Sequence, residues 1–194
     1  PSLTLEILNS EAELAEKQNL LRNTLISMEQ EKLTLRQNKA QLDLDVARKR
    51  RAFEQNDELY AHRLIAHEEW LQAKEDWELE LMRKAQAITD RAFAEVITRI
   101  KPGMTELELQ AELIYCMYKN GGTGLAFDPI VVSGPNTSLP HGVAGERVIQ
   151  KGDFVTMDFG ASYMGYCSDM TRTVAVGYAT DEMKHVYDTV LKAQ

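Results

Sequence analysis

The sequence predicts an α+β protein in which a purely helical part precedes a mixed part with a small antiparallel sheet. Neither glycine nor proline occurs between Ser2 and Lys101, whereas all eleven glycines and four of the five prolines follow residue 101. Helices tolerate so long a stretch without either residue, whereas sheets and their turns use both. The second observation is a seven-residue apolar repeat before residue 61, and the third is a set of short apolar runs after residue 127. We expect domains at 1–78 and 79–194.

Apolar side chains that recur every seven residues indicate a coiled-coil seam in the first part. The repeat comprises two interleaved series, Leu14, Leu21, Met28, Leu35 and Leu42, and Leu25, Val46, Phe53 and Tyr60. Gln18, Lys32 and Lys39 interrupt the second series and favour a specific register over stability. We expect the helix to reverse between His62 and His67 and to pack against a second helix that begins near Glu68. The prediction for residues 1–78 is therefore an antiparallel α-helical coiled-coil hairpin.

The second part is predicted to alternate helices with strands. No glycine or proline interrupts the junction near 77–81, so the second hairpin helix is expected to continue into the next helix. The expected helices cover 83–100 and 105–119 and open again near Thr180, and the expected strands cover 128–133, 146–159 and 166–177.

Two aspartates, Asp158 and Asp169, are the most informative residues for chemistry. They lie at equal distances from a turn that we place between Tyr163 and Met164, so they are expected to face each other across a hairpin. Directly opposed positions have Cβ atoms about 5 Å apart, and like charges there are destabilising unless a cation is shared. Such a pair can bridge two divalent metals about 3.5–4 Å apart. The alternative is that both carboxylates are solvated or paired with basic side chains.

Several motifs in a fixed order resemble the pita-bread metallopeptidases. The motifs are the segments 101–106, 127–136 and 139–142, the two aspartates, and Thr171-Arg172-Thr173. The likeness covers about residues 79–194 and is greatest to Xaa-Pro aminopeptidases and prolidases, with methionine aminopeptidase as a relative. It implies that this part forms the first half of a pita-bread domain.

The resemblance also implies the site residues. Asp158 and Asp169 correspond to metal ligands, and His141 corresponds to a histidine that binds substrate and stabilises the tetrahedral intermediate. A divalent metal pair is implied, and manganese, cobalt, iron and zinc all suit such ligands. The remaining ligands, a histidine and two glutamates, are expected beyond residue 194, so the site is expected to be incomplete in this chain and peptide hydrolysis absent without them. His141 as an ordinary loop residue is the competing interpretation.

Residues 5–78 have a second resemblance, to the helical hairpin of periplasmic adaptor (membrane-fusion) subunits of efflux pumps. It is carried by segments 9–14, 21–24, 42–45, 58–65 and 68–69. A non-enzymatic adaptor or scaffold is therefore the alternative function. Since the two likenesses imply different compartments, cytoplasmic and periplasmic, we expect a truncated or composite polypeptide, with a natural peptidase carrying a helical extension as the other reading.

Composition limits the remaining classes. A net charge of −8 argues against nucleic acid as a partner, and no apolar run is long enough to span a bilayer. No secretory signal is visible, although a chain that starts at Pro1 does not exclude one. Cys116 and Cys167 are expected to be buried thiols without a disulfide. The expected partners are a peptide substrate and further copies of the chain, held through the coiled coil or an exposed sheet face.

Thr171 and Thr173 fall on the Asp169 face of the predicted strand by alternation. They are expected either to hold the carboxylate by hydrogen bonds or simply to favour the strand.

Overall fold

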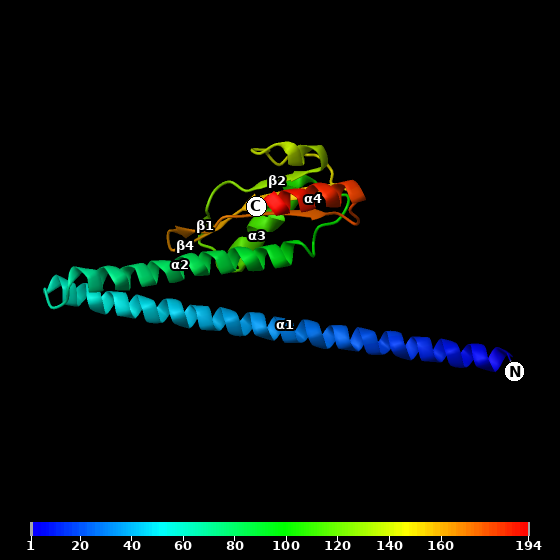
Figure 1. Ribbon diagram of the computed structural model, residues 1–194, viewed down its shortest axis with the longest axis horizontal. Coiled ribbons are helices and arrows are strands. Elements are labelled where there is room, and N and C mark those ends of the chain that lie inside the picture. The colour runs from blue at the N-terminus through cyan, green and yellow to red at the C-terminus, as the bar shows by residue number, and fades with distance from the viewer. Residues whose placement is uncertain (1, 194) are drawn as a thin grey trace. The chain divides into compact units, whose positions relative to one another are not determined.

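The computed structural model describes the backbone of residues 2–193 and the side chains of residues 13–193 (Figure 1). Contacts divide the chain into two compact units, 1–48 and 49–194. Helix α1, Ser2–Ala61, contributes to both of them.

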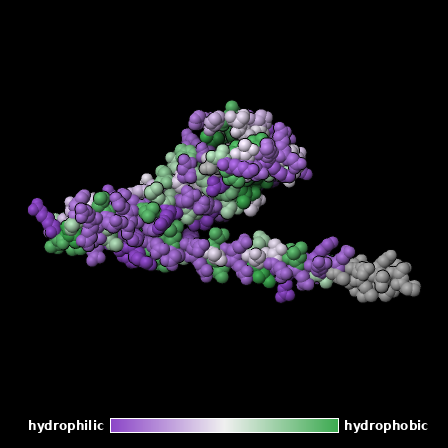
Figure 2. Space-filling view, in the orientation of Figure 1, coloured by the Kyte–Doolittle hydropathy of each residue, from purple (hydrophilic) through white to green (hydrophobic). Residues whose placement is uncertain are grey.

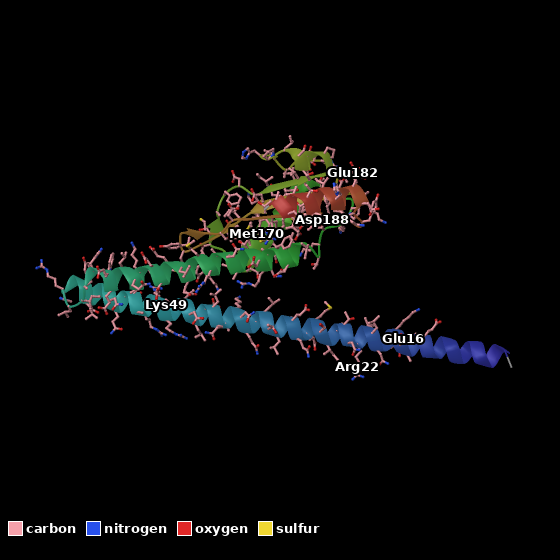
Figure 3. The ribbon with its side chains drawn as sticks, viewed as in Figure 1. Glu16, Arg22, Lys49, Met170, Glu182 and Asp188 are labelled. Atoms are coloured by element: carbon pink, nitrogen blue, oxygen red, sulfur yellow. The ribbon has the colours of Figure 1, made fainter. Side chains whose placement is uncertain are left out.

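The first unit is the N-terminal part of α1. From residue 13 on, where side chains are described, almost all of them are exposed, as Glu16 and Arg22 illustrate in Figure 3. The apolar residues of the seven-residue repeat are exposed as well, for example Leu21 at 61% and Leu35 at 51%. Figure 2 accordingly shows hydrophobic side chains scattered among hydrophilic ones along this helix. The helix is therefore as predicted, whereas the packed seam remains a prediction for this segment.

The second unit begins with the end of α1 beside the start of α2, His67–Val96. The reversal lies between these helices, where Arg63 adopts a left-handed φ of 58°. The Phe53 ring stacks on Trp77 with centroids 5.0 Å apart, and Tyr60 stacks on Trp70 at 5.2 Å. The expected reversal and the expected second helix are both present, and α2 runs unbroken through residues 77–81.

The core forms where α2 and α3, Glu106–Lys119, pack together against the sheet. Helix α3 begins with a capping box in which Thr105 and Glu108 satisfy each other's backbone amides. Both helices bury apolar residues spaced three or four apart, the period at which side chains share one helical face. These residues are Leu81, Ala85, Ile88, Ala92 and Val96 of α2, and Leu109, Leu113, Cys116 and Met117 of α3.

Two small antiparallel sheets cover this helical layer. The first has the order β2-β3-β6, with strands Ile130–Ser133, Phe154–Phe159 and Met170–Ala175. The second has the order β1-β4-β5, with strands Gly124–Leu125, Ala161–Tyr163 and Tyr166–Cys167. Odd-numbered residues of β3 are buried in the core and even-numbered ones are half-buried, so the strand has one core face and one open face.

The structure corrects several sequence predictions. A short 3₁₀ helix, Gly134–Ser138, follows β2. The expected strand 146–159 is a strand only from Phe154, because Arg147 and Ile149 form backbone bonds to residues 103–106 at and before the start of α3. Cys167 is exposed rather than buried, whereas Cys116 is buried as expected.

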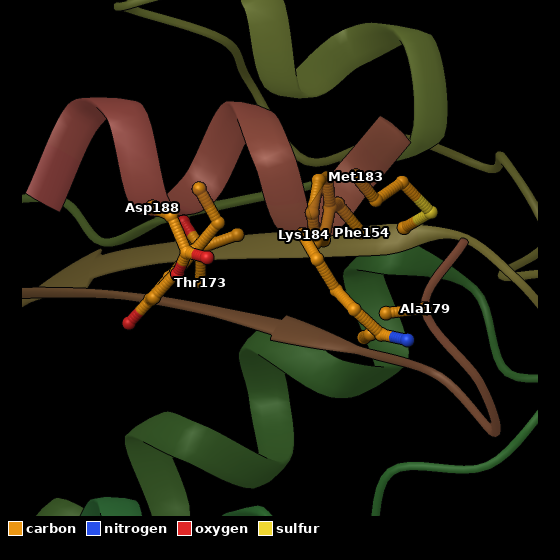
Figure 4. A pocket seen from close by; sticks show the side chains of 8 residues that line it. Phe154, Thr173, Ala179, Met183, Lys184 and Asp188 are labelled. Carbon is orange, nitrogen blue, oxygen red and sulfur yellow. The ribbon is translucent and has the colours of Figure 1, made fainter. Parts of the chain in front are cut away.

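The last helix, α4, covers Asp181–Ala193, close to its expected start. Figure 4 shows α4 on the opposite side of the strands from the core helices. Among the described residues, no helix has both the length and the apolar character that crossing a membrane requires.

Candidate metal centre

Asp158 and Asp169 are diagonal neighbours rather than directly opposed residues. Asp158 of β3 pairs with Thr171 of β6, which places Asp169 two residues from the opposed position. The expected turn position was wrong by one residue, because Tyr163 pairs with Tyr166 and the turn residues are Met164 and Gly165. Both have positive φ, 49° and 87°, which the tight turns of β-hairpins require and which glycine adopts without strain.

The two aspartates nevertheless share the open face of the hairpin. Asp158 lies between the buried residues Met157 and Phe159, and exposed Asp169 lies between buried Ser168 and Met170. Diagonal positions in an antiparallel pair are about 7–8 Å apart and still interact. The carboxylates are therefore offset but remain able to converge on a common ligand.

Thr171 fixes the carboxylate of Asp158. Its hydroxyl donates a hydrogen bond of 2.8 Å to Asp158 Oδ1, leaving the other carboxylate oxygen free of this bond. Of the two threonines singled out in the sequence, Thr171 thus holds an aspartate, but it holds Asp158 rather than Asp169. Thr173 instead pairs with Thr156 at 3.0 Å.

A buried polar cluster lies next to Asp169, where the hairpin passes from the β2-β3-β6 sheet to the β1-β4-β5 sheet. The hydroxyls of Thr89 and Ser168 lie 2.6 Å apart, and the Ala161 amide donates to both of them at 3.0 Å. At Gly160, an added Cβ would lie 1.8 Å from the Ser168 carbonyl oxygen. The two strands are therefore in close contact at Gly160, between the two aspartates, and Thr89 of helix α2 bonds to this point.

His141 is exposed on the loop that follows the 3₁₀ helix. Its neighbour Gly142 packs on Val132, since a Cβ at Gly142 would come within 2.7 Å of a Val132 methyl. Val132 pairs with Thr156 and therefore belongs to the open face that carries Asp158. The loop that carries His141 therefore packs on β2 through Gly142, on the sheet face that Val132 shares with Asp158.

Sequence reasoning missed the buried charge at the base of this loop. Glu106 is only 1% exposed and accepts hydrogen bonds from Ser133, Asn136 and Gly145. Its place in the first turn of a capped helix gave a signal for a helix start, but nothing in the sequence indicated that it faces inward.

An ion pair between Arg147 and Asp153 lies where the loop leads into β3. Arg147 donates to Asp153 at 2.7 Å and also to the Ser133 hydroxyl. Burial opposes ionisation of Asp153, but the hydrogen bonds from Arg147 and the Gln150 amide hold its pKa below the ordinary 3.8. The same hydrogen bond from Arg147 to Asp153 raises the pKa of the guanidinium.

Helix α4 bounds grooves on the open face. One groove of about 560 Å³ is lined by threonines of the sheet, by apolar residues of α4 and by Thr137 of the 3₁₀ helix. The sheet and α4 residues include Thr156, Thr171, Thr173, Val186 and Leu191. A second, of about 330 Å³, lies beside it, and Figure 4 shows Thr173, Phe154, Lys184 and Asp188 around it.

Among the residues whose side chains are described, 13–193, no three His, Cys, Asp or Glu side chains gather in a way that could hold a metal ion. Two aspartates on one open face, one oriented by Thr171, are oxygen donors that suit a divalent cation. These residues fit part of a metal centre.

The comparisons identify relatives of the second part of the chain. The model of metallopeptidase family M24 matches residues 80–194. An uncharacterized peptidase of Bacillus subtilis is 47% identical over 121 residues, which is 62% of this chain and 34% of that protein. A Xaa-Pro dipeptidase of Pyrococcus horikoshii is 42% identical with the same coverage of both chains.

Solved structures agree with this match. An X-Pro aminopeptidase from Thermotoga maritima has a TM-score of 0.59 and 43% identity, covering 71% of this chain and 36% of that one. A prolidase from Pyrococcus furiosus has a TM-score of 0.58 and 43% identity, covering 60% of this chain and 35% of that one. The expected likeness to peptidases of this type is confirmed.

The chain spans about a third of the length of these curated relatives. The likeness of residues 5–78 to efflux-pump adaptors lies outside the family match, gains no support from these relatives and stays a prediction. Because the family model matches more than half of the sequence, the chain belongs to metallopeptidase family M24.

Proposed function

We propose that this chain contributes to a metal-dependent peptidase that removes N-terminal residues, with Xaa-Pro peptides as the preferred substrates. The observation that carries the proposal is the open face that Asp158 and Asp169 share, next to the His141 loop that packs on β2 through Gly142. The names of the relatives, a Xaa-Pro dipeptidase and a prolidase, support the substrate class.

In this proposal Asp158 and Asp169 hold the divalent metals, and Thr171 orients Asp158 through its hydrogen bond. When bound, such metals polarise a carbonyl and lower the pKa of water so that it can attack near neutral pH. His141, on its exposed loop, donates a hydrogen bond to the substrate carbonyl oxygen as negative charge develops there. Manganese, cobalt, iron and zinc remain the candidate metals.

The first prediction concerns metal binding by residues 1–194. Because the described side chains supply only a pair of ligands, we expect weak binding of Mn²⁺ or Co²⁺ in a calorimetric titration. Asp158→Asn and Asp169→Asn should each abolish it, whereas Asp181→Asn, which removes an exposed carboxylate from α4, should not. For the same reason we expect no turnover of Xaa-Pro or methionyl peptides by residues 1–194 alone.

Two results would contradict this proposal. Binding that survives both aspartate substitutions would move the metal away from the hairpin. Turnover by residues 1–194 that disappears in Asp169→Asn would show instead that the described residues form a complete site.

A further inference from the structure

Glu106 is a fully buried carboxylate whose hydrogen bonds reach both ends of the segment from Ser133 to Gly145. Its Oε1 accepts from the Ser133 amide at 2.7 Å, from the Ser133 hydroxyl at 2.8 Å and from the Asn136 amide group at 3.1 Å. Its Oε2 accepts from the Gly145 amide at 3.2 Å. A buried charge is tolerated only when hydrogen bonds replace its water shell, and these donors do so.

These contacts join the two ends of the segment that carries His141. Ser133 ends β2 and Asn136 lies in the 3₁₀ helix, whereas Gly145 lies where the loop returns to α3. The start of α3 adds backbone bonds to the returning end, from the Glu106 amide to the Arg147 carbonyl and from the Leu107 amide to the Gly145 carbonyl. The loop between these anchors is short, and its middle rests on β2 where Gly142 meets Val132.

A carboxylate is the side chain that suits this place. It accepts at both oxygens and donates at neither, and all of its partners here are donors. A glutamine of the same shape offers one oxygen and one NH₂ group. Whichever way its amide turned, the NH₂ would face a buried backbone N–H, that of Gly145 or that of Ser133.

We propose that Glu106 is a positioning residue for His141: by tying Ser133 and Asn136 to Gly145, its carboxylate fixes the loop that carries His141 and packs on β2. This proposal rests on the proposed function in one respect, the role of His141 in binding the substrate. The hydrogen bonds from Glu106 to the loop involve neither metal nor peptide. Glu106 contacts no reacting atom and acts through the loop.

The test compares Glu106→Gln with Glu108→Gln in the whole chain. Both variants remove one negative charge from the first turn of α3, but the Glu108 side chain is exposed and bonds only to the Thr105 amide. NMR spectra of ¹³C-labelled histidine would follow His141, identified by the signal that disappears in His141→Gln. Amide hydrogen exchange would follow Ser133 and Gly145, and thermal unfolding would report global stability.

In Glu106→Gln we expect the His141 signal to shift and to broaden or split, because the loop then occupies more than one position. The Ser133 or Gly145 amide should exchange roughly tenfold faster or more, as expected when a hydrogen bond to a charged group is lost. In Glu108→Gln the His141 signal should stay unchanged. A purely structural role for Glu106 would lower thermal stability in a folded variant without moving the His141 signal.

An unchanged His141 signal in folded Glu106→Gln overturns the proposal. If that variant does not fold, Asn136→Ala decides the question, since it removes one half-buried donor and leaves the carboxylate in place. A shifted His141 signal in Asn136→Ala supports the proposal, and an unchanged one overturns it. Failure of the metal titration would leave these results standing, so the two proposals fail separately.

Discussion

Glu106 and Asp153 show that carboxylates in this protein have different tasks in different surroundings. Asp158 and Asp169 lie on an open face, whereas Glu106 and Asp153 are held by several hydrogen bonds within the fold. Buried or partly buried carboxylates of this kind stabilise one loop conformation, and their removal leaves donors without partners. The acidic residues that hold the loop and those that suit a metal are thus separate groups.

The ion pair of Asp153 predicts a pH-dependent loss of stability. Asp153→Asn should lower the free energy of unfolding by about 1–3 kcal/mol at neutral pH, because Arg147 then faces an uncharged partner. Since the pKa of Asp153 is lower in the folded chain than its ordinary 3.8, the carboxylate contributes fully above that value. The contribution is lost as the pH falls through the folded pKa.

Urea unfolding at neutral pH and at about pH 3 measures this effect. The difference between the original chain and Asp153→Asn should be smaller at the acidic pH, and Asp181→Asn should show little difference at either. If Asp153→Asn lowers the free energy of unfolding equally at both pH values, the stabilising role of the ionised Asp153 carboxylate is contradicted.

The hairpin passes from the β2-β3-β6 sheet to the β1-β4-β5 sheet between the two aspartates, and the β3–β6 register sets their offset. Thr89 of α2, Ser168 and the Ala161 amide meet at this crossing, and no side chain fits at Gly160. Helix α2 therefore contributes to the candidate metal centre although it carries none of its proposed ligands.

Gly160→Ala should be strongly destabilising for a steric reason alone. The added Cβ would lie 1.8 Å from a backbone oxygen, and backbone cannot move aside as a flexible side chain can. We expect a loss of about 3 kcal/mol or more in urea unfolding, beyond the usual range for overpacking.

Gly145→Ala is the matched control, because its Cβ would approach the Glu106 carboxylate only to an ordinary 3.9 Å. Equal stability of the two variants would show that the strands at Gly160 are farther apart than described.

The whole molecule combines a first unit that is part of a single helix with a second unit that has a hydrophobic core. Residues 13–48 expose nearly all their side chains, whereas the end of α1 stacks its rings on α2. Most helical stability in proteins comes from packing, so the first unit should open more easily than the second.

Limited trypsin digestion tests this difference. We expect early cleavage up to the basic run Arg48, Lys49, Arg50 and Arg51, leaving a resistant fragment that begins near residue 50. Phe53→Ala should extend cleavage toward Arg63, because it removes the ring that stacks on Trp77. Mass spectrometry would follow the amounts of the full-length chain and of the fragment. If the full-length chain resists trypsin as long as the fragment does, a partner covers the first helix.

Local signals in the sequence explain which elements were predicted well. The long helices follow from the missing glycine and proline, and the start of α3 follows from Thr105 and Glu108. The prediction of a strand from residue 146 was wrong. Val148 and Ile149 pair with Thr105 and Met104, just before α3, and the local sequence does not show this partner. Local patterns do not specify distant partners.

The helical first part, the reversal after residue 61 and the motifs of family M24 could all be read from the sequence. The offset between Asp158 and Asp169, the bond from Thr171 to Asp158 and the burial of Glu106 could not, because they depend on how the chain packs. Periodicity and capping depend on neighbouring residues, whereas register and burial depend on contacts between distant segments, where a one-residue change in the turn moves each side chain to a new partner.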